Sequence, residues 1–140
     1  MKVNKMEDCI FCKIAKGEIP SAKIYENEKV FAFLDIAPMN KGHALIVPKE
    51  HHKDLLDMPD NLLLEVMKAA KKVAKAIVKA VGADGFNIGQ NNGRASGQAV
   101  MHYHIHIIPR FEDDGLKHWP QGKYEEGEID KVAEDVKALL

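Results

Sequence analysis

The sequence predicts an α+β domain with a largely antiparallel sheet, one long helix and a second helix at the C-terminus. Three observations support this fold class. Short β-type runs follow one another without a helix between them, one long apolar pattern of helical period lies mid-chain, and strands and helices do not alternate regularly. At 140 residues, the chain has the size of a single domain, 1–140.

The first part of the chain predicts a short helical turn and three strands. The turn lies in DCIFCKIAKGEIP, where Gly17 closes it and Pro20 stops it. Two strands are predicted in KIYENEKVFAFLDI, with the polar residues Glu26–Glu28 as the turn between them. A third strand is predicted in GHALIVPK, between Gly42 and Pro48.

One long helix is predicted between Pro59, which is tolerated in a first helical turn, and Gly82, which stops the helix. Its apolar residues recur at steps of three and four: Leu63, Val66, Ala70, Val73, Ile77 and Val81. Its other faces carry Lys68, Lys71, Lys72, Lys75 and Lys79. We interpret these lysines as a solvated face rather than a nucleic-acid site.

The remaining elements are two strands and a C-terminal helix. FNIGQNNG predicts a strand that runs into a turn, and YHIHIIP predicts another strand. After Pro109 the chain becomes polar and acidic, until apolar residues at helical spacing predict a last amphipathic helix. These residues are Ile129, Val132, Ala133, Val136 and Leu139.

Charge and hydropathy exclude several classes of protein. The 20 basic and 21 acidic residues give a formal net charge of −1, which argues against nucleic-acid binding through overall charge. No apolar run approaches the roughly 20 residues that span a membrane, and MKVNKMEDCIFCK lacks the apolar core of a signal peptide. We therefore expect a cytoplasmic protein without membrane or nucleic-acid partners, whose cysteines are thiols.

MHYHIHIIPR places His102, His104 and His106 at alternate positions. Side chains alternate across a strand, so the three imidazoles face one way and the apolar residues between them face the other. A lone buried histidine is usually satisfied by a hydrogen bond, but three aligned rings need three sets of partners. The pattern therefore indicates a functional row of histidines.

Two kinds of chemistry fit such a row. Three imidazoles could hold a catalytic Zn²⁺ with an open position. Alternatively, one ring could attack phosphorus while the others position it and handle protons and charge. The preceding NNGRASGQAV favours the second, because a glycine-rich turn can present backbone N–H groups to a phosphate. A metal hydrolase would also need an acidic group on a nearby strand. Asp35 could be that group, but nothing specific in the sequence indicates it.

This combination resembles the histidine triad family of nucleotide-binding hydrolases. The resemblance lies in CIFCKIAKGEIP, VFAFLDIAPMNKGHALIVPKEHH and NNGRASGQAVMHYHIHIIPR. The matched core is 9–110, and 111–140 is a C-terminal segment that varies between branches of the family. The chain is most similar to the small intracellular branch related to protein kinase C-interacting protein and its bacterial counterparts. The resemblance implies the histidine triad fold, with an antiparallel sheet of about five strands that continues across a homodimer.

The resemblance also implies hydrolysis of purine nucleoside phosphoramidates and related AMP-linked compounds through a covalent nucleotidyl-histidine. In this sequence His104 would attack the α-phosphorus and His106 would hydrogen-bond the phosphate. His43 would complete the catalytic set, and His102 would orient the network. The alternatives are a dinucleoside polyphosphate hydrolase and, in another class, a non-enzymatic nucleotide-binding adaptor.

Other positions match the family's nucleotide contacts. Asp35 would hold the ribose hydroxyls, because a carboxylate can accept from both. Asn91 and Gln98 would lie around the α-phosphate and leaving group, and Gly97 would permit close approach of the backbone. Without the resemblance, the carboxylate and the amides fit ordinary strand-end or turn residues. Ala99 departs from the pattern: many relatives carry Ser or Thr there, and losing that donor would cost about 1–2 kcal/mol.

Cys9 and Cys12 form a C-x-x-C pair, and KEHH supplies two later histidines. This is half of a tetrahedral zinc pattern; two buried structural cysteines are the alternative, and a redox pair has no matching context. The resemblance implies a structural zinc ion held by Cys9, Cys12, His51 and His102, with His52 facing solvent. No redox or organic cofactor is expected.

The C-terminal segment contains the only tryptophan, Trp119, in LKHWPQGKY. Its aromatic ring could simply pack on the body of the domain from a surface loop. By analogy with relatives whose C-terminal segments differ between branches, it could instead contribute to specificity or to a dimer. The sequence does not choose between these two, and His118 is given no role.

Overall fold

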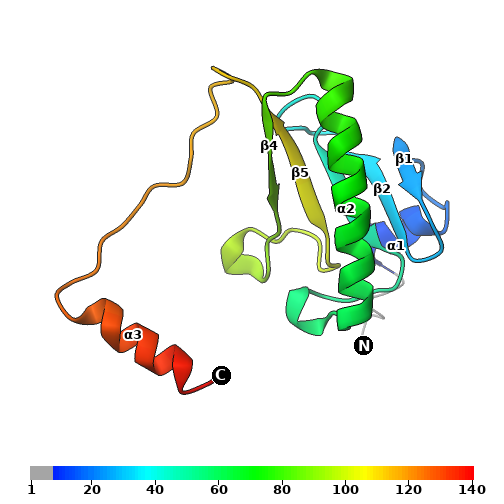
Figure 1. Ribbon diagram of the computed structural model, residues 1–140. Helices are drawn as coiled ribbons and strands as arrows, with labels where there is room; N and C mark the ends of the chain where they lie inside the picture. The colour runs from blue at the N-terminus through cyan, green and yellow to red at the C-terminus, as the bar shows by residue number, and fades with distance from the viewer. Residues whose placement is uncertain (1–7) are drawn as a thin grey trace.

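The computed structural model describes residues 8–140 and has a five-stranded sheet with the strand order β1-β2-β3-β5-β4 (Figure 1). Every neighbouring pair is antiparallel. The strands are β1 (Lys23–Glu26), β2 (Val30–Leu34), β3 (Ala44–Pro48), β4 (Gly85–Gly89) and β5 (Ile105–Arg110). The helices are α1 (Ile10–Ala15), α2 (Asp60–Val81) and α3 (Glu128–Lys137), with short 3₁₀ turns at Leu55–Asp57 and Arg94–Ser96. The predicted fold class is confirmed.

Helix α2 covers one face of the sheet (Figure 1). The predicted apolar pattern is largely confirmed, because Val66, Ala70, Val73 and Ile77 are buried against the sheet. Burial of each such valine or isoleucine stabilises the fold by roughly 1.5–3 kcal/mol. Gly82 ends the helix in the left-handed conformation, with φ 65°. This layer fixes the sheet that carries the site.

The opposite face of the sheet is covered near β2 and β3 by α1, through a second cluster of buried residues. Alternate residues of the two strands belong to different clusters: Val30 and Ala32 lie in the cluster with α2, whereas Phe31 and Phe33 lie in the cluster with α1. Phe11 of α1 packs edge-on against Phe33, with ring centroids 5.7 Å apart. Both faces of the central strands are therefore buried.

The predicted strand YHIHIIP begins later than expected, because β5 starts at Ile105. The backbone N–H of Tyr103 donates to the carbonyl of His52 at 2.7 Å, in a loop, and not to a neighbouring strand. The alternation of sides nevertheless continues before the strand. Tyr103 and Ile105 pack in the cluster with α2, whereas the rings of His102 and His104 contact Phe11.

The C-terminal segment leaves the domain after β5, and α3 stands apart from the sheet (Figure 1). The predicted amphipathic helix forms, but none of its residues is buried. Among residues 8–140, no helix is long and apolar enough to cross a membrane. The expected lack of a signal peptide concerns the N-terminus, of which residues 1–7 lie outside the described part of the chain.

Candidate functional site

The three histidines of the row differ in burial. His102 is 0% exposed and His104 is 7% exposed, whereas His106 is only half-buried. The rings of His104 and His106 lie 4.9 Å apart between centroids, and the ring of His43 lies 5.2 Å from that of His106. The structure therefore brings the three predicted catalytic histidines together, while His102 lies deeper.

A chain of hydrogen bonds fixes the protons of His43 and His106. The backbone N–H of Met39 donates to Nδ1 of His43 at 3.1 Å, so a neutral His43 carries its proton on Nε2. That Nε2–H donates to Nδ1 of His106 at 2.9 Å. A neutral His106 then carries its proton on Nε2, where it can serve as a donor.

His104 has the opposite arrangement. Its Nδ1–H donates to the backbone carbonyl of His102 at 2.7 Å, which leaves the lone pair of Nε2 free in the neutral ring. Burial lowers the pKa of His104, against the opposing effect of its bond to the His102 carbonyl. Burial also lowers the pKa of His43, and it lowers that of His106 to about 4. The neutral ring of His104 has a free lone pair, and the neutral ring of His106 beside it has a free N–H. The first is suited to attack an electrophile, and the second can stabilise the negative charge on that electrophile.

Asp35 lies at the edge of this group. Its Oδ2 is 3.8 Å from Nε2 of His43, and its Oδ1 accepts the N–H of Ala37 at 2.9 Å. Asp35, His43 and His106 are close enough to offer three ligands to a metal ion. However, the Met39 N–H leaves His43 protonated on the nitrogen that faces the group. The hydrogen bonds therefore favour a proton relay over a metal centre at this position.

The backbone before His43 is held tightly. Gly42 has φ +97°, and a Cβ at this position would lie 3.1 Å from Cγ1 of Val81 and 3.2 Å from Cγ of Pro109. Any larger residue would strain the turn and press against the end of α2 and β5. The glycine thus lets the loop approach closely enough for the His43 ring to reach His106.

The glycine-rich loop before the histidines is organised by Gln98. Its Oε1 accepts the N–H of Gly93 at 2.8 Å, and its Nε2 donates to the carbonyls of Lys53 and Val100 at 2.7 and 3.1 Å. The amide is 4% exposed, and both of its N–H groups are engaged by the backbone. The structure therefore gives Gln98 a role in shaping the loop.

Gly97 and Asn91 lie side by side in this loop. Gly97 has φ +97°, and a Cβ there would come 3.5 Å from Nδ2 of Asn91, so conformation rather than space demands glycine. Asn91 lines a cavity of about 670 Å³ together with His106, Gly89 and Ser96. Ala99, by contrast, lines another cavity beside Cys9 and His51.

A polar network that the sequence did not reveal holds the loop containing Met39 and Asn40. Arg110 binds Asp114 through two hydrogen bonds, Nε to Oδ2 at 2.8 Å and Nη2 to Oδ1 at 3.1 Å. Asn40 Nδ2 donates to Asp114 Oδ2 at 3.0 Å and to the carbonyl of Pro109 at 2.9 Å. The carbonyl of Asn40 accepts the N–H of His43 at 3.0 Å. The network therefore positions His43, and the Arg110 guanidinium lowers the pKa of Asp114 well below its usual range.

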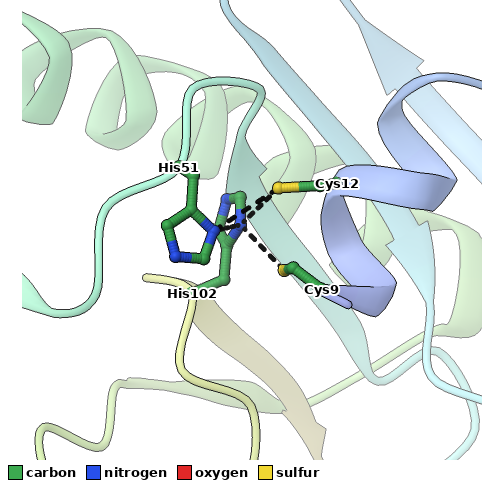
Figure 2. A group of neighbouring side chains, drawn as sticks. All are labelled: Cys9, Cys12, His51 and His102. Carbon is green, nitrogen blue, oxygen red and sulfur yellow. Dashed lines mark hydrogen bonds between the residues drawn. The ribbon is translucent and has the colours of Figure 1, made fainter. Parts of the chain in front are cut away.

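The four predicted metal ligands form a second site (Figure 2). Nδ1 of His102 lies 3.3 Å from Sγ of Cys9, 3.5 Å from Sγ of Cys12 and 3.1 Å from Nδ1 of His51. Sγ of Cys12 lies 3.4 Å from the same nitrogen of His51. Tetrahedral zinc with N and S ligands has ligand–ligand separations of about 3.3–3.8 Å, so three of these four distances fall within that range and the distance between the two Nδ1 atoms, 3.1 Å, lies slightly below it. The donor set and its spacing therefore fit a zinc ion.

The surroundings of this site also suit a metal. The Nε2–H of His102 donates to the carbonyl of Pro48 at 2.8 Å, which leaves Nδ1 free to face the other ligands. Burial, with a hydrogen bond that the Cys12 thiol donates to Cys9, raises the pKa of Cys12 to about 11; a bound cation would reverse this by stabilising the thiolate. His52 lies outside the group and bonds Glu50 at 2.9 Å; its side chain is 13% exposed, so it is less open to solvent than expected.

Comparisons with known proteins agree with this fold. The sequence profile of the HIT domain family matches residues 16–113. The adenosine 5'-monophosphoramidase of Saccharomyces cerevisiae is 47% identical over 134 residues, which are 94% of this chain and 80% of the relative. A Zn-bound histidine triad family protein from Mycobacterium smegmatis is 33% identical, with a TM-score of 0.76 over 96% of this chain and 99% of that one.

The crystal structure of a Streptococcus mutans protein has a TM-score of 0.89 and 41% identity, over 99% of this chain and 87% of that chain. The matched region includes the C-terminal segment as well as the sheet. Together with the profile match, this shows that the chain belongs to the HIT domain family, the histidine triad family expected from its sequence.

Proposed function

We propose that the protein hydrolyses purine nucleoside phosphoramidates and related AMP-linked compounds, with release of AMP. The observation that carries this proposal is the pairing of a free Nε2 lone pair on His104 with a free Nε2–H on the adjacent His106. The first can attack phosphorus, and the second can donate to a phosphate oxygen. The phosphoramidase activity named for the yeast relative supports the same reaction class.

The proposed reaction has two steps. Nε2 of His104 forms a bond to the α-phosphorus while the bond from phosphorus to the leaving atom breaks, and the leaving group departs with a proton from water. Water then attacks the phosphorus and gives a proton to the hydroxide left by the first step, the N–P bond breaks, and His104 recovers its lone pair as AMP leaves. Throughout, His106 donates to a phosphate oxygen, and His43 holds His106 in the required tautomer.

The remaining nucleotide contacts are part of the same proposal. Asp35 accepts the ribose hydroxyls, since its carboxylate keeps unused acceptor capacity at the edge of the histidines. Asn91 and the backbone around Gly97 face the α-phosphate, with Gln98 setting the shape of their loop. Ala99 supplies no hydroxyl and lines the other cavity, so the phosphate donors of this loop are backbone N–H groups.

A panel of substrates tests this function against its alternatives. We expect AMP release from adenosine phosphoramidate to exceed release from diadenosine polyphosphates by at least about tenfold in kcat/KM. The opposite order would favour a dinucleoside polyphosphate hydrolase, and binding of AMP without turnover of either would indicate an adaptor. A chelator added at the start of the assay should leave the initial rate unchanged; immediate loss in a folded protein would favour a metal hydrolase.

We propose a structural zinc ion held by Cys9, Cys12, His51 and His102. Four protein ligands leave no open position, so the ion would tie α1 to the segment before β5 and take no part in hydrolysis. The Zn-bound relative from Mycobacterium smegmatis supports the choice of metal. Two reduced thiols at such a site suit a cytoplasmic protein.

We also propose a homodimer in which β4 continues the sheet. Among residues 8–140 this strand is an edge of the sheet, and an exposed edge readily pairs with another chain. Phe86 and Ile88 of β4 are each 46% exposed and line an apolar hollow with Leu64 and Met67 of α2. Such a surface is typical of an interface between identical subunits.

Ile88→Lys tests this interface. The added charge would be buried against the partner, so sedimentation should show the mass falling from twice 15.6 kDa to 15.6 kDa. Leu56→Lys is the matched control, because Leu56 is 92% exposed and does not line the apolar hollow between β4 and α2. A wild-type monomer, or a dimer that resists Ile88→Lys, would contradict the proposed interface.

A further inference from the structure

The loop 36–41, which leads to His43, is held by few contacts. Ile36 and Met39 are 99% and 61% exposed, and Asn40 is the one residue of the loop that is partly buried. Within the described chain, 8–140, the hydrogen bonds of this loop stay close to it in sequence, except those of the Asn40 side chain. A segment with so few buried contacts opens easily, so the bonds of Asn40 hold it in place.

Asn40 ties the loop to the end of β5. Its Nδ2 donates to the carbonyl of Pro109, a buried residue of β5, at 2.9 Å, and to Oδ2 of Asp114 at 3.0 Å. The side chains of Arg110 and Asp114 are only 19% and 7% exposed, so water screens their paired bonds less than those of a surface ion pair. The loop is therefore anchored to a rigid part of the sheet.

Asp114 can fill this place only as a carboxylate. Its Oδ2 accepts from Asn40, from Nε of Arg110 at 2.8 Å and from the N–H of Phe111 at 3.1 Å. Its Oδ1 accepts from Nη2 of Arg110 at 3.1 Å and from the N–H of Leu116 at 3.0 Å. The two oxygens of a carboxylate can accept all of these donors, whereas an amide would turn its NH₂ group toward at least two of them in either orientation. Asp114→Asn would therefore disrupt the network while keeping the size of the side chain.

The position of the loop decides where two imidazoles carry their protons. The rings of His43 and His106 share one hydrogen bond, and either ring could supply its proton. The N–H of Met39 removes this choice, because it occupies Nδ1 of His43 and leaves the proton on Nε2. Oδ2 of Asp35 is 3.8 Å from that Nε2, which is too far for a hydrogen bond, so Asp35 does not replace the Met39 N–H. With the opposite tautomers, the proton of His106 would lie on Nδ1, and none would remain on Nε2 for a phosphate oxygen.

We infer that Asn40 and Asp114 are positioning residues for the proposed reaction. They hold the Met39 N–H against His43 and so keep the proton of His106 on Nε2, the nitrogen that donates to the phosphate. The inference rests on the proposed function for its effect on the rate, whereas its effect on the tautomers depends on no substrate.

The tautomers test the inference directly. Two-bond ¹⁵N–¹H spectra of histidine-labelled protein, recorded at mildly alkaline pH where the rings are neutral, show which ring nitrogen bears the proton. We expect His43 and His106 to be protonated on Nε2 in the wild type, and both rings to show a mixture of tautomers in Asn40→Ala and in Asp114→Asn. Wild-type tautomers in both variants would overturn the inference.

Asp84→Asn is the matched control for the loss of a negative charge near the end of β5. Oδ2 of Asp84 accepts the N–H of Glu112 at 2.8 Å, and an amide oxygen can make the same bond. The control should keep the tautomers of the wild type and a rate within about twofold of it.

Kinetics provide the second measurement. In Asn40→Ala and Asp114→Asn, kcat for adenosine phosphoramidate should fall by at least about tenfold while KM stays within about threefold, because the misplaced donor acts on charge in the transition state. An unchanged kcat in a variant with altered tautomers, or a rise in KM alone, would contradict the inference. Asn40→Ala changes a partly buried loop residue, so the test stands even if Asp114→Asn does not fold. A wild-type protein without turnover would instead defeat the proposed function while the spectra still test the tautomers, so the two failures are distinguishable.

Discussion

His104→Asn should reduce AMP release from adenosine phosphoramidate by about 10⁴-fold, while the variant still binds AMP. The reason lies in the direction of the ring. Nδ1 is held by the carbonyl of His102, so Nε2 is the nitrogen available to phosphorus. The asparagine amide has no comparable nucleophilic lone pair, whereas its size and polarity preserve most of the buried site. Initial rates, together with AMP titration by calorimetry, separate the loss of chemistry from the loss of binding.

The matched control is His52→Asn, which removes an imidazole outside both histidine groups. The ring of His52 contacts Glu50, so its loss should leave the rate within about twofold. Rapid quenching of the wild-type enzyme during turnover should also capture nucleotide on His104. A His104→Asn variant with near-normal rate, or nucleotide trapped on another residue, would show that the nucleophile is assigned wrongly.

The sequence predicted those features that depend on local periodicity. Alternation along MHYHIHIIPR separated the imidazoles from Tyr103 and Ile105, and C-x-x-C with KEHH identified half of a metal pattern. The predicted start of β5 was wrong because the N–H of Tyr103 donates to the carbonyl of a distant loop. The periodicity of the sequence contains no information about such a contact. The fold class was predictable, since the amphipathic pattern of α2 and the strand runs are themselves local.

The supporting network was not predictable for the same physical reason. Asn40 reaches Asp114 and Pro109 across about 70 residues of sequence, and APMNKG reads as an ordinary turn. The tautomer of His43 depends on the Met39 N–H, whose position is set by that turn. Gln98 was expected at the phosphate from its place in the motif, but its backbone partners emerge only in three dimensions. Residue type thus identified the reacting groups, whereas tertiary contacts determine their protonation and orientation.

His51→Gln should abolish zinc binding and lower the free energy of unfolding by about 3 kcal/mol or more. A structural zinc ion contributes on the order of 10–16 kcal/mol of binding energy to folded small domains, and a lost ligand forfeits a substantial part of it. The variant would also leave the Cys12 thiol facing His102 without the proposed cation between them. Metal analysis should give about one zinc per wild-type chain and none per variant, and denaturant unfolding measures the stability.

His52→Gln is the adjacent control and should retain zinc, because its ring lies outside the four-ligand group. Cys9→Ser should behave like His51→Gln, since its Sγ lies 3.3 Å from Nδ1 of His102. Wild-type protein without zinc, or full zinc content in either ligand variant, would contradict the site.

The effect of zinc loss on hydrolysis should be indirect and slow. Phe11, between the two cysteines in sequence, packs edge-on against both His102 and His104, with ring centroids 5.9 and 5.0 Å apart. The carbonyl that orients His104 also belongs to His102, a proposed zinc ligand. Loss of the ion would therefore loosen the backbone that aims the nucleophile, so we expect activity to decline with the unfolding of α1 and not at the moment of chelation. A rate that falls at once, while α1 stays folded, would place the metal in the reaction itself.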